Sequence, residues 1–574
     1  MIFISDCMAN TDSRLFSMQF PKTAHTTDYA NPKKTLHMNI KIQMLDCTLR
    51  DGAYVNDSKF GAPVIKGVIK RMQDAHIDVI ECGWLKDSPH KNGSSFFHVP
   101  SDIEPYLLER NEHVIYVVMI DWNRYDLNNL PERDGKSIDA IRVVFPHGKH
   151  MEGVEVAKKI KEKGYEVFLQ AANSLAYSDT DLISLANAVN ETHPLSLSIV
   201  DTFGAMYSED LKRIVEILDR HLDSEIKLGF HSHNNQQLSF ALSIQFVEML
   251  CRSERGAVVD SSLCGMGRGA GNTTTELLAE YLNCKHQGNY DMNTILDAID
   301  MYVRPFQDVC EWGYSTNYFI AGVCCTHVNN IAYLLNNHRS SAKDIFSIIN
   351  SLSPADRINY DYSLLEQKYM EHHSHVANDE IALAELKKAL QGRPILLIAS
   401  GKSINDERDK ILAYIAAKNP IVIGVHTFLA DYKYDYLFFS NKLRYEYAKE
   451  VHHNLFAPVT KIVASNIKAT PDDNEIVVNY NTLIKRGWPH FDNSVITCLR
   501  LLNKLHIEDV ALAGFDGFSH KYVESYADPS LPSLNPDNKW DELNGEIKEM
   551  FEDFKKATEH SMEITFLTNS IYNK

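Results

Sequence analysis

Eight short apolar runs, rich in β-branched residues, lie between residues 40 and 263, and helix-like segments separate them. Near-continuous apolar runs are typical of parallel strands that are buried on both faces. Each gap between runs is long enough for a crossover helix, so the pattern predicts an α/β fold, the (β/α)8 TIM barrel. Periodicity alone also allows an open, doubly wound sheet. The runs cover residues 40–48, 79–84, 114–120, 141–146, 166–172, 195–201, 227–233 and 257–263.

Polar residues gather where these predicted strands end. In a TIM barrel the active site is built at the carboxyl ends of the strands, so the polar set agrees with the predicted fold and marks a candidate site. The set comprises Asp46, Asp51, Glu81, Asn173, Asp201, His231, His233, Asn235 and Asn272.

Two histidines, His231 and His233, lie two residues apart at the end of the seventh run. Side chains at this spacing in a strand point to the same face, so both imidazoles can reach one ion. Together with the carboxylate of Asp51 they form a mixed set that suits Mn²⁺, Zn²⁺, Fe²⁺ or, less well, Mg²⁺. Three protein ligands leave positions for water or a chelating substrate. The alternative is a pair of strand-end histidines that only hydrogen-bond to neighbours, and the two histidines alone favour it.

Two further features flank the candidate ligands. Arg50 carries a permanent charge on a planar fork that suits carboxylate or enolate oxygens, and it could also pair with Glu81. The glycine-rich run at residues 265–272 allows the backbone to approach a ligand closely, although such a run is more often a flexible loop.

The chain has 574 residues, which exceeds one ordinary core and predicts two or more domains. Residues 1–38 are polar and lack the continuous apolar core of a signal peptide, so we expect a flexible N-terminal extension there. We expect the barrel at residues 39–285, a helical extension at 286–391 and a second, Rossmann-like α/β domain at 392–574.

The second α/β pattern begins at residue 395, with further strands predicted at 421–425, 436–440, 461–464, 475–478 and 510–513. The turn from Ser400 to Ser403 could present backbone N–H groups to a phosphate, but it lacks the P-loop spacing and is as well explained by an ordinary strand-to-helix turn. The loop from Gly514 to Phe518 is a second candidate ligand-binding edge.

The composition excludes some classes of partner. The net charge of −18 disfavours a nucleic-acid or anionic-membrane binder, because phosphate affinity needs clustered Lys and Arg. No apolar run approaches the roughly 20 residues that span a bilayer. The ten cysteines form no C-x-x-C pair, which favours reduced thiols in a cytoplasmic protein.

Five motifs, in order, resemble those of the DRE-TIM metallolyase superfamily, and most closely those of the 4-hydroxy-2-oxovalerate (pyruvate) aldolases. This resemblance favours a metal site over the purely structural explanation of the two histidines. The motifs are Asp46-Cys-Thr-Leu-Arg-Asp-Gly52, Glu81, Val200-Asp-Thr-Phe-Gly204, His231-Ser-His-Asn-Asn235 and Gly265-Met-Gly-Arg-Gly-Ala-Gly-Asn272.

The resemblance implies that Asp51, His231 and His233 hold a divalent metal, Mn²⁺ or Mg²⁺ rather than Zn²⁺. Asn272 corresponds to a further ligand in the lyase branch. Arg50 corresponds to the arginine that stabilises the enolate, and Glu81 to the glutamate that supports this arginine.

Two tyrosines are further candidate catalytic residues. Tyr54 stands where the aldolases have a catalytic histidine, and a tyrosine of ordinary pKa, about 10, is a poor base at neutral pH. Either the metal and Arg50 lower its pKa, or a metal-bound water is the base, or the substrate differs. Tyr314 is similar to a tyrosine of the helical extension that reaches the aldolase site.

We therefore expect a metal-dependent aldolase that joins or cleaves a 2-oxo acid and an aldehyde through a pyruvate enolate, in a homo-oligomer. The alternatives are a Claisen-type acyltransferase that uses acetyl-CoA and a nucleotide-sugar-binding or transferase protein that acts through the C-terminal domain. Residues 395–518 are similar to bacterial glycan-associated α/β domains, some related to sialyltransferases, which implies a nucleotide or nucleotide-sugar ligand and a role in surface-polysaccharide synthesis.

Overall fold

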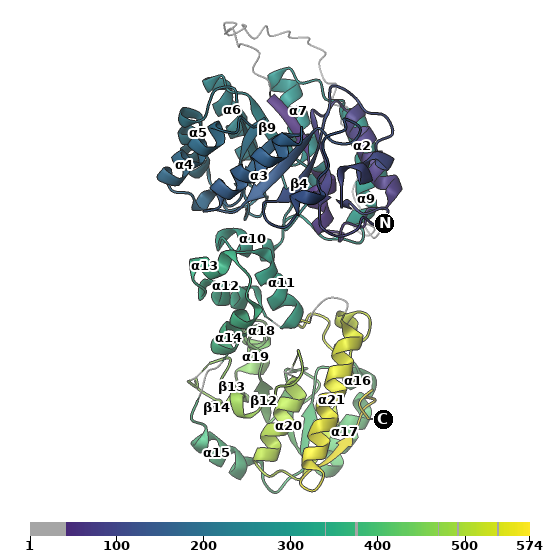
Figure 1. Ribbon diagram of the computed structural model, residues 1–574. Coiled ribbons are helices and arrows are strands. Elements are labelled where there is room, and N and C mark those ends of the chain that lie inside the picture. Colours follow the sequence, from purple (N-terminus) through teal and green to yellow (C-terminus); the bar gives the residue numbers. More distant parts are fainter. Residues whose placement is uncertain are drawn as a thin grey trace, which may run out of the picture. The chain divides into compact units, whose positions relative to one another are not determined.

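The computed structural model describes residues 42–338, 340–373, 377–468, 470–490, 493–535 and 539–573 (Figure 1). The extension expected at residues 1–38 lies outside the described residues. All nine cysteines of the described part are free thiols. No helix in that part is long and apolar enough to cross a membrane.

The first domain is a closed barrel of eight parallel strands, as predicted. Strand β1 pairs with β2 on one side and with β9 on the other, which closes the sheet and rules out the open alternative for this region. A short ninth strand, β3 (Phe96–Phe97), is added beside β2. The barrel strands are β1 (Ile42–Asp46), β2 (Val79–Leu85), β4 (Ile115–Asp121), β5 (Ala140–Phe145), β6 (Glu166–Ala171), β7 (Ser196–Asp201), β8 (Lys227–Ser232) and β9 (Ala257–Ser261).

Amphipathic helices cover the outside of the barrel (Figure 1). In α5, for example, Leu211, Ile214, Val215 and Leu218 are buried, at the three- and four-residue spacing of one helix face. The covering helices are α2 (Ala62–Asp74), α3 (His150–Glu162), α4 (Asp179–Asn190), α5 (Ser208–His221), α6 (Ser239–Ser253) and α7 (Thr275–His286).

The helices that follow the barrel pack into more than one hydrophobic core. Helix α8 (Met292–Ala298) contributes Ile295 to the barrel core. The next helices surround a small core of their own, which includes Ile320, Leu334, Ile345 and Leu365. They are α10 (Thr316–Val323), α11 (Val328–Asn337), α12 (Ala342–Asn350) and α14 (Tyr362–His373), whereas the short α13 (Pro354–Ile358) has no buried residue.

Helix α15 (Glu380–Leu390) packs with the second sheet. Its Leu386 and Leu390 lie in the same core cluster as Ile395 of that sheet's first strand. This helix, which lies within the range expected for the extension, therefore contributes to the core of the second domain.

The second domain is a seven-stranded parallel sheet in the order β14-β13-β12-β11-β10-β15-β16, which confirms the predicted α/β fold. Six of its strands match the prediction. The seventh, β16, was missed, because Glu-Ile-Thr-Phe offers only two apolar residues. The strands are β10 (Ile395–Ile398), β11 (Ile421–Val425), β12 (Tyr436–Phe439), β13 (Thr460–Ala464), β14 (Glu475–Val478), β15 (Asp509–Ala513) and β16 (Glu563–Phe566).

Helices lie on both faces of this sheet. The buried residues of α20 (Ser494–Lys504) and α21 (Trp540–Thr558) join one core cluster, and those of α17 (Arg408–Lys418) and α18 (Lys442–Val451) join clusters that involve the alternate strand residues. The strand order reverses between β10 and β15, so these neighbours form the topological switch point, where such sheets bind ligands.

Candidate metal centre

Asp51 is held at the mouth of the barrel by the tight helical turn α1 (Thr48–Asp51), which follows β1 directly. Asp46 fixes this turn, because its carboxylate accepts hydrogen bonds from Thr48 N at 3.1 Å and from Thr48 Oγ1 at 3.0 Å. Thr275 Oγ1 donates to the same carboxylate at 2.9 Å. Burial raises the pKa of Asp46 to about 6. The short turn thus directs Arg50 and Asp51 into the buried end of the barrel.

His231 and His233 enter the site from the end of β8. Phe230 packs outward on Phe246 of α6, with ring centroids 5.4 Å apart. Because successive strand side chains alternate in direction, His231 points to the interior, and His233 continues on the same side. The same-face arrangement predicted for the pair is therefore present.

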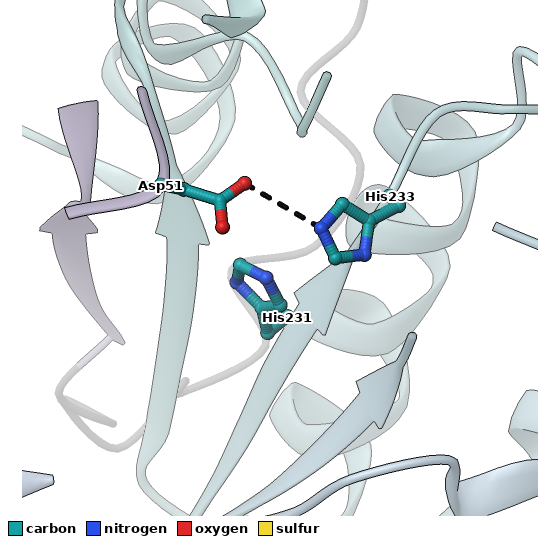
Figure 2. Close-up of side chains that lie close together, drawn as sticks. All are labelled: Asp51, His231 and His233. Atoms are coloured by element: carbon teal, nitrogen blue, oxygen red, sulfur yellow. Dashed lines mark ion pairs between the residues drawn. The ribbon is translucent and has the colours of Figure 1, made fainter. Parts of the chain in front are cut away.

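The side chains of Asp51, His231 and His233 point toward one another (Figure 2). One ligand atom of each lies within 4.8 Å of the others, and all three residues are buried. His233 Nε2 lies 3.4 Å from Asp51 Oδ2. Each imidazole is held through its other nitrogen: His231 Nδ1 lies 3.0 Å from Asp260 Oδ2, and His233 Nδ1 lies 3.2 Å from the carbonyl oxygen of Asp201. Such outer contacts orient metal-binding histidines.

Asn272 lies against Asp51 and donates through Nδ2 to Asp51 Oδ2 at 2.7 Å. Its oxygen Oδ1 is buried without a hydrogen-bond partner among the described residues. Gly267 makes this approach possible, since a Cβ there would lie 2.3 Å from Asn272 Nδ2 and 2.5 Å from Asp51 Oδ2. The glycine-rich run therefore serves close backbone approach at this position.

Arg50 and Glu81 form the predicted ion pair, with Arg50 Nε 2.8 Å from Glu81 Oε2. Arg50 also pairs with Asp51 through Nη1. Its Nη2 is buried without a partner among the described residues, so this donor remains for a ligand. Glu81 Oε2 accepts a second bond from Arg142 at 2.8 Å. Arg142 in turn pairs with Asp260, the partner of His231.

The charges of the cluster suit a divalent cation. Burial opposes ionisation of Asp51, but the Arg50 charge and the contact with His233 outweigh it and hold the pKa of Asp51 well below its usual range. Burial lowers the pKa of His231 to about 4, which leaves the neutral imidazole that binds metals. His233 Nε2 and Asn272 Oδ1, both buried without hydrogen-bond partners in the described part of the chain, are the atoms that such an ion would satisfy.

Tyr54 ends the turn Gly52–Tyr54 that follows α1. Its ring meets Trp84 edge-on at 6.2 Å and lies under the guanidinium of Arg268 at 5.2 Å. Although 45% of the residue is exposed, desolvation raises its pKa to about 12, and this outweighs the opposite effect of Arg50. Arg50 by itself therefore does not lower the pKa of Tyr54 into the range of a base at neutral pH.

Tyr314 is 63% exposed and lines an open pocket together with Asn272 and Gly265. The neighbouring Trp312 donates through Nε1 to the carbonyl oxygen of Cys264 at 3.0 Å. The loop that carries Tyr314 thus borders the glycine-rich run, but no contact joins Tyr314 to the three candidate ligands.

Arg268 was not singled out from the sequence, although it interrupts the glycine-rich run. Its backbone N–H donates to Asp51 Oδ2 at 3.3 Å, and its Nη2 lies 2.8 Å from His327 Nε2 and 3.1 Å from Asn329 Oδ1. Burial and the Arg268 charge lower the pKa of His327 to about 3. Arg268 therefore carries a charge with neutral partners beside the site.

Residues 148–302 match the sequence profile of the family described as HMGL-like. An oxaloacetate decarboxylase from Mycobacterium tuberculosis is 24% identical over 265 residues, which cover 44% of this chain and 74% of the relative. A 4-hydroxy-2-oxovalerate aldolase from Salinispora arenicola is 28% identical over 284 residues, or 46% of this chain and 75% of the relative. In sequence the barrel is similar to the HMGL-like, or DRE-TIM, family. The family resemblance seen in the five motifs is thereby confirmed.

Among solved structures, the N-terminal domain of a candidate aldolase from Bacteroides vulgatus is 25% identical, with a TM-score of 0.45. The similarity covers 54% of this chain and 100% of that one. The buried Asp51, His231 and His233 are consistent with the divalent-metal site of the family that the barrel resembles.

Proposed function

We propose that the barrel is a divalent-metal-dependent enzyme that forms or cleaves a carbon–carbon bond through the enolate of a 2-oxo acid such as pyruvate. The observation that carries the proposal is the buried cluster of Asp51, His231 and His233 beside the free Nη2 of Arg50. The names of the relatives support it, since loss of CO₂ from oxaloacetate and retro-aldol cleavage of 4-hydroxy-2-oxovalerate both give the pyruvate enolate.

Asp51, His231 and His233 would hold Mn²⁺ or Mg²⁺, with Asn272 Oδ1 within the same buried cluster. When bound, the ion supplies a Lewis acid for the 2-oxo group. Asp51 remains ionised and His231 neutral at neutral pH, so the protein presents both in the protonation state that coordination requires.

Arg50 would stabilise the negative charge of the enolate. Its Nε is anchored on Glu81 and its Nη1 on Asp51, so the guanidinium is fixed before substrate arrives. The remaining donor, Nη2, needs no rearrangement to bond with a developing oxyanion. Glu81 acts as a positioning residue, because it touches Arg50.

Tyr54, with a pKa of about 12, is protonated at neutral pH and is suited to donate a hydrogen bond. In the aldol direction its hydroxyl would donate to the oxygen of the aldehyde as negative charge develops there.

The protonated Tyr54 also favours a second candidate function, the decarboxylation of a 2-oxo diacid. This reaction forms the enolate by loss of CO₂ and needs no general base, which fits a site with tyrosine at this position.

The test is exchange of the methyl protons of pyruvate in deuterated water with added Mn²⁺, because exchange requires the enolate. We expect exchange in the wild type and none in Asp51→Asn or His233→Ala, while His113→Ala, at an exposed histidine, behaves as wild type. Equal exchange in the wild type and both site variants would exclude the proposal.

A substrate panel then separates the candidate functions. Oxaloacetate tests decarboxylation, and pyruvate with sugar aldehydes tests the aldolase and the expected role in surface-polysaccharide synthesis. Release of free CoA from acetyl-CoA with a 2-oxo acid would select the acyltransferase instead.

A further inference from the structure

A cavity lies at the switch point of the second sheet, far along the chain from the metal centre. Loops that follow β10, β11, β12, β14 and β15 converge on it. Its volume is about 110 Å³, several times the roughly 10–15 Å³ of cavity volume that one water molecule needs. The polar residues that line it include Ser400, His426, Asn441, Arg444, Asn493 and Ser494.

Among the described residues that line the cavity, Arg444 is the only one with a permanent charge, because none of the others is Asp, Glu or Lys. Within the described part of the chain it forms no ion pair. Its contacts are neutral: Nε donates to the carbonyl oxygen of Pro532 at 3.1 Å, Nη1 donates to Ser400 Oγ at 3.3 Å, and the guanidinium lies 4.8 Å from the centre of the Tyr526 ring. The described lining of the cavity therefore carries a positive charge that no described carboxylate pairs with, which favours an anionic ligand.

The surroundings of Arg444 add to this charge. Helices α18 and α20 begin at the cavity, after Asn441 and Asn493, and a helix N-terminus is electropositive. Each asparagine caps its helix through its side-chain oxygen. Their side-chain NH₂ groups form no hydrogen bond with a described residue and remain as donors. His426 adds no charge, since burial and the Arg444 charge hold its pKa well below its usual range.

The neighbouring turn from Ser400 to Ser403 does not provide an anion site of its own. The carboxylate of Asp516 accepts hydrogen bonds from Ser403 N at 2.7 Å and from Ser403 Oγ. The carboxylate of Asp516 thus occupies the position in which this turn would bind a phosphate. The segment from Ser400 to Ser403 is therefore an ordinary strand-to-helix turn. Helix α16 (Ser403–Asp406) is also only four residues long.

We propose that this cavity binds a phosphate ester, with Arg444 as the residue that contacts the phosphate. The guanidinium group can bond to two phosphate oxygens at once. The side-chain NH₂ groups of Asn441 and Asn493 can donate hydrogen bonds to the remaining oxygens. Phe518 and Tyr526, which also line the cavity, add aromatic surface beside Arg444. The ester can be a nucleotide or a sugar phosphate, since both present the same group to Arg444.

The test is titration calorimetry on the full chain with inorganic phosphate, a panel of nucleoside 5′-monophosphates and a panel of sugar 1-phosphates. We expect at least one ester to bind, and Arg444→Gln to weaken it by about 10- to 100-fold, as for loss of a hydrogen-bonded charge. Arg486→Gln, at an exposed arginine of the same domain, is the matched control and should bind as wild type. Asp51→Asn should also bind as wild type, which separates this site from the barrel.

Two results would overturn the proposal: no binding by any panel member at millimolar concentration, or equal binding by the wild type and Arg444→Gln. Circular dichroism establishes whether Arg444→Gln is folded. If it is not, Ser533→Phe, which places a ring at the cavity lining and keeps the charge, decides the question: loss of binding supports the site and unchanged binding overturns it. Tighter binding by nucleotides or by sugar phosphates identifies which of the two is the source.

Discussion

The Nδ1 atom of His231 lies 3.0 Å from Oδ2 of Asp260, a carboxylate that also pairs with Arg142. Asp260 therefore fixes the ring of His231 so that Nε2 is the nitrogen left for a metal. Loss of a hydrogen bond that orients a metal-binding histidine lowers the affinity for the metal, even when the histidine itself is unchanged.

Asp260→Asn should weaken Mn²⁺ binding by about 10- to 100-fold. The asparagine keeps the shape but lacks the charge that orients the imidazole. Titration calorimetry with Mn²⁺ measures the effect, and Glu209→Gln, at an exposed position of α5, is the control. Wild-type affinity in a folded Asp260→Asn protein would contradict the role.

Arg50→Lys should lower the rate of pyruvate proton exchange by about 100-fold or more while Mn²⁺ affinity changes little. Lysine keeps the charge but cannot bond Glu81 and an enolate oxygen at once through a planar fork. Exchange rate and Mn²⁺ affinity are measured on the same preparation. Equal losses in both would indicate that Arg50 acts only by holding Asp51.

Tyr54→Phe should retain pyruvate proton exchange and lose aldol addition, because the hydroxyl acts on the second substrate. With a pKa of about 12, Tyr54 stays protonated throughout the range up to pH 10, so the wild-type and variant exchange rates should depend on pH in the same way. If the exchange rate of the wild type rises with pH between pH 6 and 10 and that of Tyr54→Phe does not, the tyrosine is the base.

Gly267→Ala should abolish Mn²⁺ binding in a folded protein, because the added Cβ would overlap Asn272 Nδ2 and Asp51 Oδ2. Gly545→Ala is the matched control, since a Cβ there meets nothing within 4 Å. Circular dichroism and Mn²⁺ titration check both variants. Unimpaired Mn²⁺ binding in Gly267→Ala would mean that the loop is free to move away.

The second sheet should lose stability as the pH falls below about 6.5, the ordinary pKa of histidine. His426 Nε2 accepts a hydrogen bond from Ser440 N at 2.8 Å, and the pKa of the folded residue is well below normal. As the pH falls, His426 is therefore protonated in the unfolded chain before it is protonated in the folded protein. Its contribution to the free energy of unfolding is fully present above pH 6.5. Below pH 6.5 this contribution falls by about 1.4 kcal/mol per pH unit.

Hydrogen exchange of peptides from β11 and β12 at pH 7.5 and pH 5.5, corrected for intrinsic rates, measures this change in the free energy of opening. His426→Phe keeps a ring but does not titrate, so its difference between the two pH values should be smaller by about 1.4 kcal/mol. The same difference in both proteins would assign the pH dependence to other groups.

The sequence predicted the barrel well because its strands are apolar throughout, and strand ends in a barrel meet at one mouth. Asp51 could thus be placed beside His231 and His233, although His231 lies 180 positions further along the chain (231 − 51). Arg142 and Asp260 were missed because each lies within an otherwise apolar strand, and an apolar run predicts a buried strand but no functional residue. A charge inside such a strand is itself a signal, since it needs a buried partner of opposite sign.

Other features depend on packing that no local pattern contains. Arg268 stood in a glycine-rich run, and only the fold brings His327 and Asn329 to its guanidinium. The charge of the second-domain cavity likewise depends on which loops meet there. Neither Arg444 nor Asn493 was distinguished by its neighbours in the sequence.

A chain of ion pairs runs from Arg50 through Glu81 and Arg142 to Asp260, and a hydrogen bond joins Asp260 to the neutral His231. They join the turn after the first barrel strand to the last strand. During synthesis, therefore, the first ligand emerges from the ribosome long before its electrostatic surroundings exist. The ligands can be held in this arrangement only when β9, which carries Asp260, has been made and has paired with β1, so metal uptake reports completion of the barrel.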